Sequence, residues 1–305
     1  MTRERMWWLQ QRLAPYLFLA PFVVIFCAFL LYPLGRSVVL SLYKAVGPRK
    51  LLFVGLDNYR FLLQDDMFWR SVVNTAYFAV LFLSIQIPLS LLLSVLLNSR
   101  RLRGRSFFRF AFFSTHMVGG VFVAVIFGML LAPRHGLVNQ AIGFVLPSIG
   151  PELNWFGRPE LAMPAVVIAA LWISVGYAMV YFLAALQSVD RELYEAAEVD
   201  GAGKLAQFWH VTLPGIRPVL TFMILVGTIG ALQLFELPYV LFYLSSTNYS
   251  MTIVMYLFQM GLETGDIGYA SAIGWMLVVL ILLVSLVQIV VARLGWGGGP
   301  GGAAR

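Results

Sequence analysis

Long apolar runs separated by short polar connections dominate the chain and predict membrane-spanning helices. A span needs roughly 20 apolar helical residues, because each backbone amide in the bilayer must find its partner within the segment. Six windows of the sequence meet this requirement, at approximately residues 15–42, 71–97, 107–132, 163–187, 219–244 and 269–292. The pattern therefore predicts an all-α, polytopic membrane protein with six transmembrane helices and both termini on the same side.

The composition supports this prediction and excludes an ordinary soluble domain. Hydrophobic residues make up 60% of the chain and charged residues only 11%. The spans and their connections use nearly all of the 305 residues. We therefore expect one membrane domain over residues 15–292, between an N-terminal tail of residues 1–14 and a flexible, glycine-rich C-terminal tail of residues 293–305.

The distribution of Lys and Arg predicts the orientation in the membrane. Thirteen of these residues fall on the side of the termini and six on the opposite side, and the run RRLRGR at residues 100–105 contributes most. Cytoplasmic connections carry the excess of positive charge, so both termini are expected in the cytoplasm. The net charge is +7, and the basic residues cluster beside apolar segments. This placement favours contact with membrane lipid and argues against binding of nucleic acid.

A polar passage of residues 195–218 separates the fourth and fifth windows. Acidic and small residues precede Gly201, and an apolar stripe of helical spacing follows it until Pro214 and Pro218. Acidic residues favour a helix N-terminus, and glycine allows the chain to reverse. The passage therefore predicts a short helix, a bend and a second short helix. From composition alone, a connection lying on the bilayer and a docking surface for another protein are equally open.

The same passage resembles the EAA loop of binding-protein-dependent ABC transporter permeases. The matching residues are Glu195, Ala196, Ala197, Asp200, Gly201, Leu213 and Pro214. Further stretches in the same order are similar to carbohydrate permeases of the MalF or UgpA type, among them LAPFVVIFCAFLLYPLGRSVVLSLY, GLVNQ and LQLFELPYV. The resemblance implies the MetI-like fold of type I importers, with a coupling loop at about residues 190–218 that contacts an ATPase. After Val240 the chain departs from the family's usual Thr-x-Gly-Gly-Pro turn.

The resemblance also implies partners and a location. We expect a second permease subunit, two ATPase subunits that bind ATP and Mg²⁺, and an extracytoplasmic solute-binding protein, in a bacterial or archaeal inner membrane. The chain has no G-x-x-x-x-G-K-[ST] phosphate loop, so ATP hydrolysis is assigned to a partner. The three histidines are far apart in sequence, so we expect no metal, no cofactor and no catalytic site in this chain.

Polar residues inside the apolar windows indicate where a solute could pass. Glu236 is the only acidic residue within them. Gln233 lies one helical turn earlier, so we expect the two side chains on the same face, and Pro238 beside them could open the helix locally. Intramembrane charge is costly and generally faces a bundle interior or a wet cavity. A second group, on the fourth window, consists of Trp172, Ser174, Tyr177 and Tyr181. Hydrogen-bonding and aromatic side chains suit a sugar pathway. The alternative is that Glu236 pairs with another helix or subunit and the tyrosines pack between helices.

Two other classes of function make different demands on the sequence. An ion-coupled secondary transporter would show paired ionisable residues at mid-membrane and internal repeats, and a membrane enzyme would show a convergent catalytic set; neither pattern is found. Within the family, a glycerophosphodiester or polyol is the second candidate cargo. A phosphodiester calls for cationic residues along the pore, whereas the windows offer Glu236.

Overall fold

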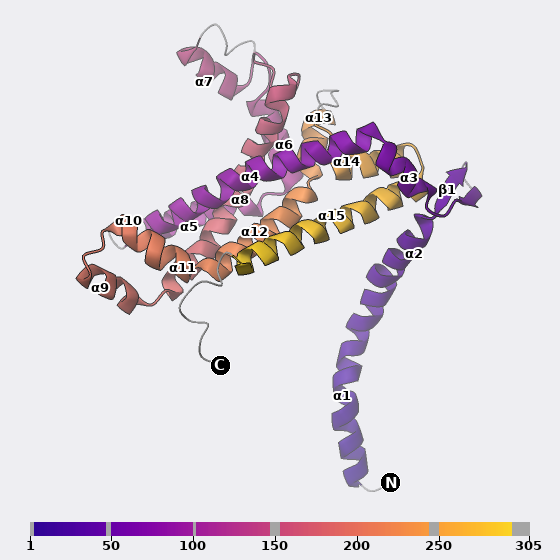
Figure 1. Ribbon diagram of the computed structural model, residues 1–305, viewed down its shortest axis with the longest axis horizontal. Helices are drawn as coiled ribbons and strands as arrows, with labels where there is room; N and C mark the ends of the chain where they lie inside the picture. The colour runs from indigo at the N-terminus through magenta and orange to yellow at the C-terminus, as the bar shows by residue number, and fades with distance from the viewer. Residues whose placement is uncertain (1–2, 47–49, 100–101, 147–152, 244–249, 295–305) are drawn as a thin grey trace. The chain divides into compact units, whose positions relative to one another are not determined.

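The protein folds into helices that form two compact units. The computed structural model describes residues 3–46, 50–99, 102–146, 153–243 and 250–294 (Figure 1). Unit 1 consists of Met1–Asp65 and Leu257–Met276, and unit 2 of Asp66–Tyr256 and Leu277–Arg305. The predicted C-terminal tail from residue 295, and residues 244–249 of the last predicted outer connection, lie outside the described residues.

Unit 1 begins with one long helical segment followed by a hairpin. Its elements are α1 (Arg3–Phe26), the π-helix η1 (Cys27–Leu31), α2 (Tyr32–Leu40), β1 (Tyr43–Val46), β2 (Lys50–Phe53), α3 (Asp57–Gln64), the π-helix η5 (Gln259–Glu263) and the first turns of α15 (Ile267–Leu294). β1 pairs antiparallel with β2, so that Tyr43 lies opposite Phe53. The first helix starts inside the predicted tail of residues 1–14.

Side-chain hydrogen bonds and one close backbone approach hold the hairpin, α3 and the start of α15 together. The side-chain amide of Asn58 donates to the carbonyls of Ser41 at 2.8 Å and Tyr43 at 2.9 Å. A Cβ at Gly268 would lie 1.8 Å from the carbonyl oxygen of Tyr43, so only glycine fits there. The hydroxyl of Tyr269 donates to Asp65 at 2.5 Å.

The first apolar span is left almost entirely uncovered by the described residues. None of the hydrophobic window in residues 12–40 is buried. Exposed side chains there include Phe18, Phe22 and Phe29, which are 85%, 65% and 80% exposed. A run this apolar needs a non-aqueous surrounding, which lipid or another membrane protein supplies.

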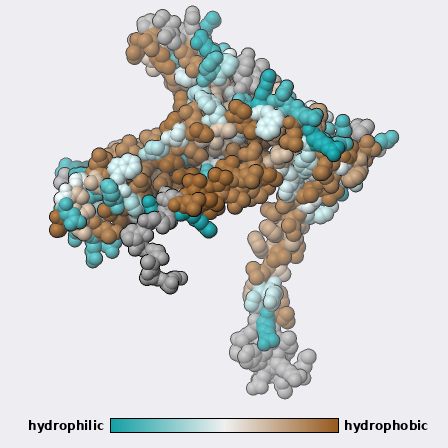
Figure 2. All heavy atoms as spheres, in the orientation of Figure 1, coloured by the Kyte–Doolittle hydropathy of each residue, from teal (hydrophilic) through white to brown (hydrophobic). Residues whose placement is uncertain are grey.

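Unit 2 contains the remaining spans and connections. Its elements are α4 (Asp66–Asn98), α5 (Arg105–Ser114), the 3-10 helix η2 (Thr115–Met117), α6 (Gly120–Leu130), α7 (Leu137–Val145), α8 (Pro159–Ser188), α9 (Arg191–Val199), α10 (Lys204–Gln207), the π-helix η4 (Phe208–Thr212), α11 (Leu213–Gly215), α12 (Arg217–Leu232), α13 (Glu236–Tyr243), most of α14 (Ile253–Phe258) and the rest of α15. On α15, residues 278–294 present an apolar surface (Figure 2).

α8 is the central helix of unit 2 and lies along α4 (Figure 1). Its small residues let neighbouring backbones approach: a Cβ at Gly176 would lie 1.8 Å from the carbonyl oxygen of Phe112 on α5. Nearer the C-terminal end of α8, Phe182 is completely buried and packs with Leu91 of α4 and Ile216. The core of the unit is therefore built around α8.

The predicted spans are confirmed with two differences. Among the residues that the structure describes, five helices are long and apolar enough to cross a membrane, and counting one bent pair as a span gives up to six. The window at 107–132 does not form one straight helix, because the chain bends by 100° between Met117 and Gly120. The window at 219–244 is interrupted at residues 233–235. Sequence periodicity did not predict the hairpin, α3, α7 or α14.

We expect Gly176→Ala to destabilise the protein, because the added methyl group would overlap the α5 backbone. Overpacking of this kind costs about 1–3 kcal/mol. The matched control is Gly230→Ala on α12, where a Cβ meets no atom within 4 Å and the helix gains up to about 1 kcal/mol of propensity. Thermal unfolding of the detergent-solubilised variants measures both effects. A melting temperature for Gly176→Ala equal to that of the unmodified protein would contradict the close contact.

Candidate functional site

The polar connection after α8 begins with an ordered helix, α9. Asp190 caps this helix by accepting a hydrogen bond from the backbone N–H of Glu192 at 3.2 Å. One turn further on, Glu195 pairs with Arg191 at 3.0 Å between Oε1 and Nε. Both side chains of this pair are well exposed, so the bond contributes little stability and leaves Glu195 accessible.

The bend predicted at Gly201 is present and has a defined geometry. Gly201 has φ of +78°, in the left-handed region. Its N–H donates to the carbonyl of Glu198 at 3.0 Å, and the N–H of Ala202 donates to that of Ala197 at 2.8 Å. This pair of bonds is a Schellman motif, which satisfies the last carbonyls of α9 and favours glycine at the turn. Asp200 closes the helix just before it.

The second half of the loop is anchored in the core of unit 2. Leu213 packs against the cluster around Phe182 and Ile216. At Gly215 a Cβ would lie 2.8 Å from a methyl group of Val189, so α11 sits directly against the end of α8. The loop is thereby held by the core.

One further bond ties the two halves of the loop. The hydroxyls of Tyr194 on α9 and Thr212 on η4 lie 3.0 Å apart. Because Thr212 is buried, this contact fixes α9 against the anchored half. The structure thus separates the predicted residues into an exposed set and a partly buried set. Glu195, Ala196, Asp200 and Gly201 are exposed, whereas Ala197, Leu213 and Pro214 are partly buried.

The exposed side of the loop carries apolar side chains. Val199 is 88% exposed, Leu205 73%, Trp209 55% and Leu193 54%. Large apolar side chains exposed on a polar connection are unfavourable in water and indicate an interaction surface. We call Leu193, Val199, Leu205 and Trp209 the loop's apolar surface.

A second site forms where the third span breaks. Residues 115–120 follow α5 and turn the chain into α6. The ring of His116 stacks on Tyr177 of α8 with centroids 4.5 Å apart. Tyr177 donates to the hydroxyl of Tyr181 at 3.1 Å, and Tyr181 lies 6.3 Å from Phe222 of α12, centroid to centroid. These rings make an aromatic row along one side of α8.

Glu236 approaches the same broken segment from α13. A Cβ at Gly120, the first residue of α6, would lie 2.5 Å from its Oε2 atom. The carboxylate therefore rests against the N-terminus of α6, where a negative charge is favourable. Glu236 is nonetheless exposed within the chain. The broken segment thus joins the aromatic row through His116 at one end and contacts the carboxylate of Glu236 through Gly120 at the other.

The break in the fifth span follows from Pro238. A proline ring clashes with the carbonyl four residues before it, which here belongs to Leu234. That carbonyl instead accepts a hydrogen bond from the buried hydroxyl of Thr252 at 2.8 Å. The open turn thereby keeps its backbone satisfied, as the interior of a membrane requires.

The predicted pathway residues do not all come together. Tyr177 and Tyr181 adjoin each other, and the hydroxyl of Ser174 bonds to the carbonyl of Ala170 in its own helix at 2.7 Å. Trp172 contacts Phe127 of α6, 6.1 Å between centroids, and takes no part in the tyrosine pair.

The helical spacing invoked for Gln233 and Glu236 is wrong, because the helix ends at Leu232 and Gln233 lies in the turn. Both side chains are exposed. His116 was missed; the Gly-Gly pair at 119–120 within an apolar window was the signal for a break beside it. In the described part of the chain, no group of three or more His, Cys, Asp or Glu is placed to hold a metal ion.

Broken apolar spans joined by a structured polar loop are features of a membrane transport component. The family described as binding-protein-dependent transport system inner membrane component matches residues 86–294. The chain therefore belongs to this family, and the resemblance stated from its sequence is confirmed.

Relatives that match over most of their length are also named as permease proteins of transport systems. The chain is 37% identical to the arabinooligosaccharides transport system permease protein AraP of Bacillus subtilis, covering 92% of this chain and 88% of that protein. It is 33% identical to the lactose transport system permease protein LacF of Rhizobium radiobacter, covering 91% and 93%. It is 32% identical to the trehalose/maltose permease protein MalF of Thermococcus litoralis, with the same coverage of 91% and 93%.

A solved structure supports the fold. A bacterial ABC transporter involved in the import of the acidic polysaccharide alginate contains a chain that superposes with a TM-score of 0.77 at 25% identity, covering 95% of this chain and 98% of that one. The predicted permease fold is thus confirmed.

We expect Thr252→Val to destabilise the protein, because the carbonyl of Leu234 would lose its partner in a buried turn. Leaving a buried polar group unsatisfied costs about 1–3 kcal/mol. Thr221→Val on α12 is the control, since the structure gives that side chain no bond to another element. Thermal unfolding in detergent, compared between the two variants, provides the measurement; equal melting temperatures would show that the turn does not depend on this bond.

Proposed function

We propose that this chain is one of two permease subunits of an ATP-driven importer for a neutral sugar or oligosaccharide. It couples to ATPase subunits through α9 and the bend that follows. The helices supply half of the translocation pathway, and the partners supply the energy. Both termini and the loop lie in the cytoplasm, in keeping with the excess of Lys and Arg on that side.

The observation that carries the docking proposal is the combination of a rigid scaffold and an exposed apolar surface in the loop. The Schellman turn at Gly201 and the anchoring of Leu213 fix its shape. The apolar surface then offers a preorganised face to a cleft in another protein, and preorganisation lowers the entropic cost of binding. A connection that merely rests on the bilayer would need neither the turn nor the anchoring.

Coupling follows from how the loop is attached. A partner that grips α9 acts on the anchored half of the loop through the bond between Tyr194 and Thr212. That half contacts Val189 at the end of α8 through Gly215 and leads through Ile216 into α12. α8 carries Tyr177 and Tyr181, so movement of the loop changes the pathway side of the same helix. ATP binding and hydrolysis in the partners would shift the pore between two states by their differential contacts.

The cargo proposal rests on side-chain chemistry and on the relatives. The aromatic row of His116, Tyr177, Tyr181 and Phe222 offers the flat apolar faces that sugars pack against, and hydroxyls donate and accept hydrogen bonds. The relatives named above are permeases for arabinooligosaccharides, lactose and trehalose or maltose. A solute-binding protein would deliver the sugar, as the family's description implies.

An anionic cargo, such as a glycerophosphodiester, is the second candidate. One relative is a permease for sulfoquinovosyl glycerol, at 30% identity, and the structural neighbour takes part in import of an acidic polysaccharide. In this chain the exposed carboxylate of Glu236 would repel such a solute. We therefore favour a neutral carbohydrate.

Gly201→Ala should uncouple hydrolysis from transport. Alanine in the left-handed region costs about 1–2 kcal/mol, which weakens the turn that shapes the loop. Gly203→Ala is the matched control two residues away, because its φ of −67° suits any residue and a Cβ meets nothing within 4 Å. Solute taken up per ATP hydrolysed, measured in proteoliposomes of the whole transporter, should fall for the first variant only. An unchanged ratio for Gly201→Ala would refute the docking proposal.

Glu236→Ala should lower uptake while the ATPase subunits stay attached. Loss of a charged hydrogen-bonding group is worth about 1.5–3 kcal/mol, or roughly tenfold to a hundredfold in rate if it acts on the transport step. Glu160→Ala, an exposed carboxylate at the start of α8, serves as the control. Labelled sugar uptake and co-purification of the ATPase are measured together. Full uptake by Glu236→Ala would remove this residue from the pathway.

A further inference from the structure

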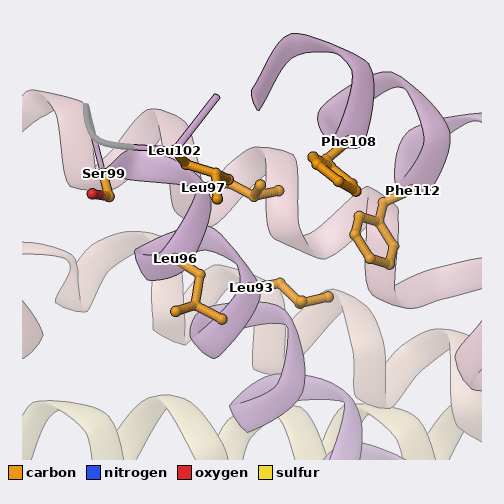
Figure 3. Close-up of a pocket in the computed structure, with 7 residues that line it drawn as sticks. All are labelled: Leu93, Leu96, Leu97, Ser99, Leu102, Phe108 and Phe112. Atoms are coloured by element: carbon orange, nitrogen blue, oxygen red, sulfur yellow. The ribbon is translucent and has the colours of Figure 1, made fainter. Parts of the chain in front are cut away.

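An apolar cavity of about 490 Å³ opens between the end of α4 and α5, and its lining includes no residue of the two sites described above. Its volume lies in the range of small-molecule sites, roughly 300–1,000 Å³. The lining residues are Leu93, Leu96, Leu97, Ser99, Leu102, Phe108 and Phe112. Figure 3 shows Leu93 of α4 directed toward Phe108 and Phe112 of α5. Apart from Ser99 the lining side chains are hydrophobic.

The cavity opens onto a surface suited to lipid. Leu96 on its rim is 54% exposed, and along α4 Leu92 and Leu89 continue the apolar surface at 55% and 37% exposed. A long apolar chain could therefore pass from this side of α4 into the cavity without crossing a polar barrier. This favours an occupant that is itself part of the bilayer.

The chain next to the cavity lining carries positive charge that forms no ion pair among the described residues. Leu102 lies within the run RRLRGR, and no Asp or Glu occurs from residue 67 to residue 151. Both ion pairs found among the described residues use other arginines. Arg103 and Arg105 are exposed beside the cavity lining. An anionic group at the mouth would supply the missing countercharge.

Arg109 brings a further positive charge close to the cavity lining. Its Nη2 donates to the carbonyl of Leu97, a lining residue, at 2.8 Å. Its Nε is buried and has no hydrogen-bond partner among the described residues. The guanidinium of Arg109 thus adds a third positive charge next to the lining residue Leu97.

We propose that this cavity binds an anionic phospholipid, with an acyl chain between α4 and α5 and its phosphate headgroup held by Arg103 and Arg105. The apolar lining selects the chain and the uncompensated arginines select the charge. The arginine run thus does more than set the topology: it retains a particular class of lipid beside the third span, which carries the break at residues 115–120.

The test is native mass spectrometry of the purified full-length chain, with equimolar phosphatidylglycerol and phosphatidylcholine of identical acyl chains. We expect retained lipid to be mainly phosphatidylglycerol. Each arginine near an anionic surface raises affinity about fivefold, so Arg103→Gln with Arg105→Gln should lower the preference about thirtyfold. The control combines Arg12→Gln with Arg293→Gln, two exposed arginines at the ends of other spans, and should keep the preference.

Variants of the cavity itself separate lipid binding from simple charge attraction. Leu96→Trp fills the cavity and should abolish retention of both lipids. Leu102→Ser, in the connection and outside any helix, is a second variant that weakens the apolar lining if the first fails to fold. Retention unaffected by these changes would overturn the proposal, and so would equal retention of the two lipids by the unmodified chain. A photoreactive residue at position 96 that traps another protein subunit in the assembled transporter, and no lipid, would also overturn it.

Discussion

The close packing of α8 is the constraint on which the rest of unit 2 depends. At Gly176 the backbone of α8 meets that of α5 with no room for a side chain, and further along Phe182 is enclosed by α4 and the start of α12. Tyr177 follows directly after the close contact, and α9 follows directly after the end of α8. A single helix therefore carries both the aromatic row and the loop for which we propose a docking role, so a force on one reaches the other.

Two spans are broken, and each break is stabilised by a specific partner. Pro238 forces the fifth span open, and Thr252 satisfies the carbonyl that this releases. The third span bends by 100° where Val118 and Gly119 take extended backbone angles, and His116 stacks on α8 beside it. Backbone in a membrane tolerates such interruptions only where its polar groups are satisfied or line a cavity. Breaks of this kind are suited to a solute pathway.

Apolar windows predicted the spans well, because the requirement for about 20 apolar residues acts on every membrane helix. The bend at Gly201 was also predictable, since glycine and the acidic first turn are local signals. The shared face of Gln233 and Glu236 was not, because the helical spacing assumed there fails once Pro238 opens the chain. His116 escaped notice because its stacking partner, Tyr177, is distant in sequence and joins it only through tertiary packing.

The central claim is that the loop after α8 is the surface gripped by a separate ATPase. Cys27 is the only cysteine, so a Cys27→Ser background allows a single thiol at Val199, in the loop's apolar surface. Thiol-specific crosslinking of Val199→Cys in membranes of the expressing cell should yield an adduct with a nucleotide-hydrolysing subunit, whereas Leu286→Cys on the apolar side of α15 should not. Equal crosslinking from both positions, or no ATPase adduct from Val199→Cys, would contradict the account.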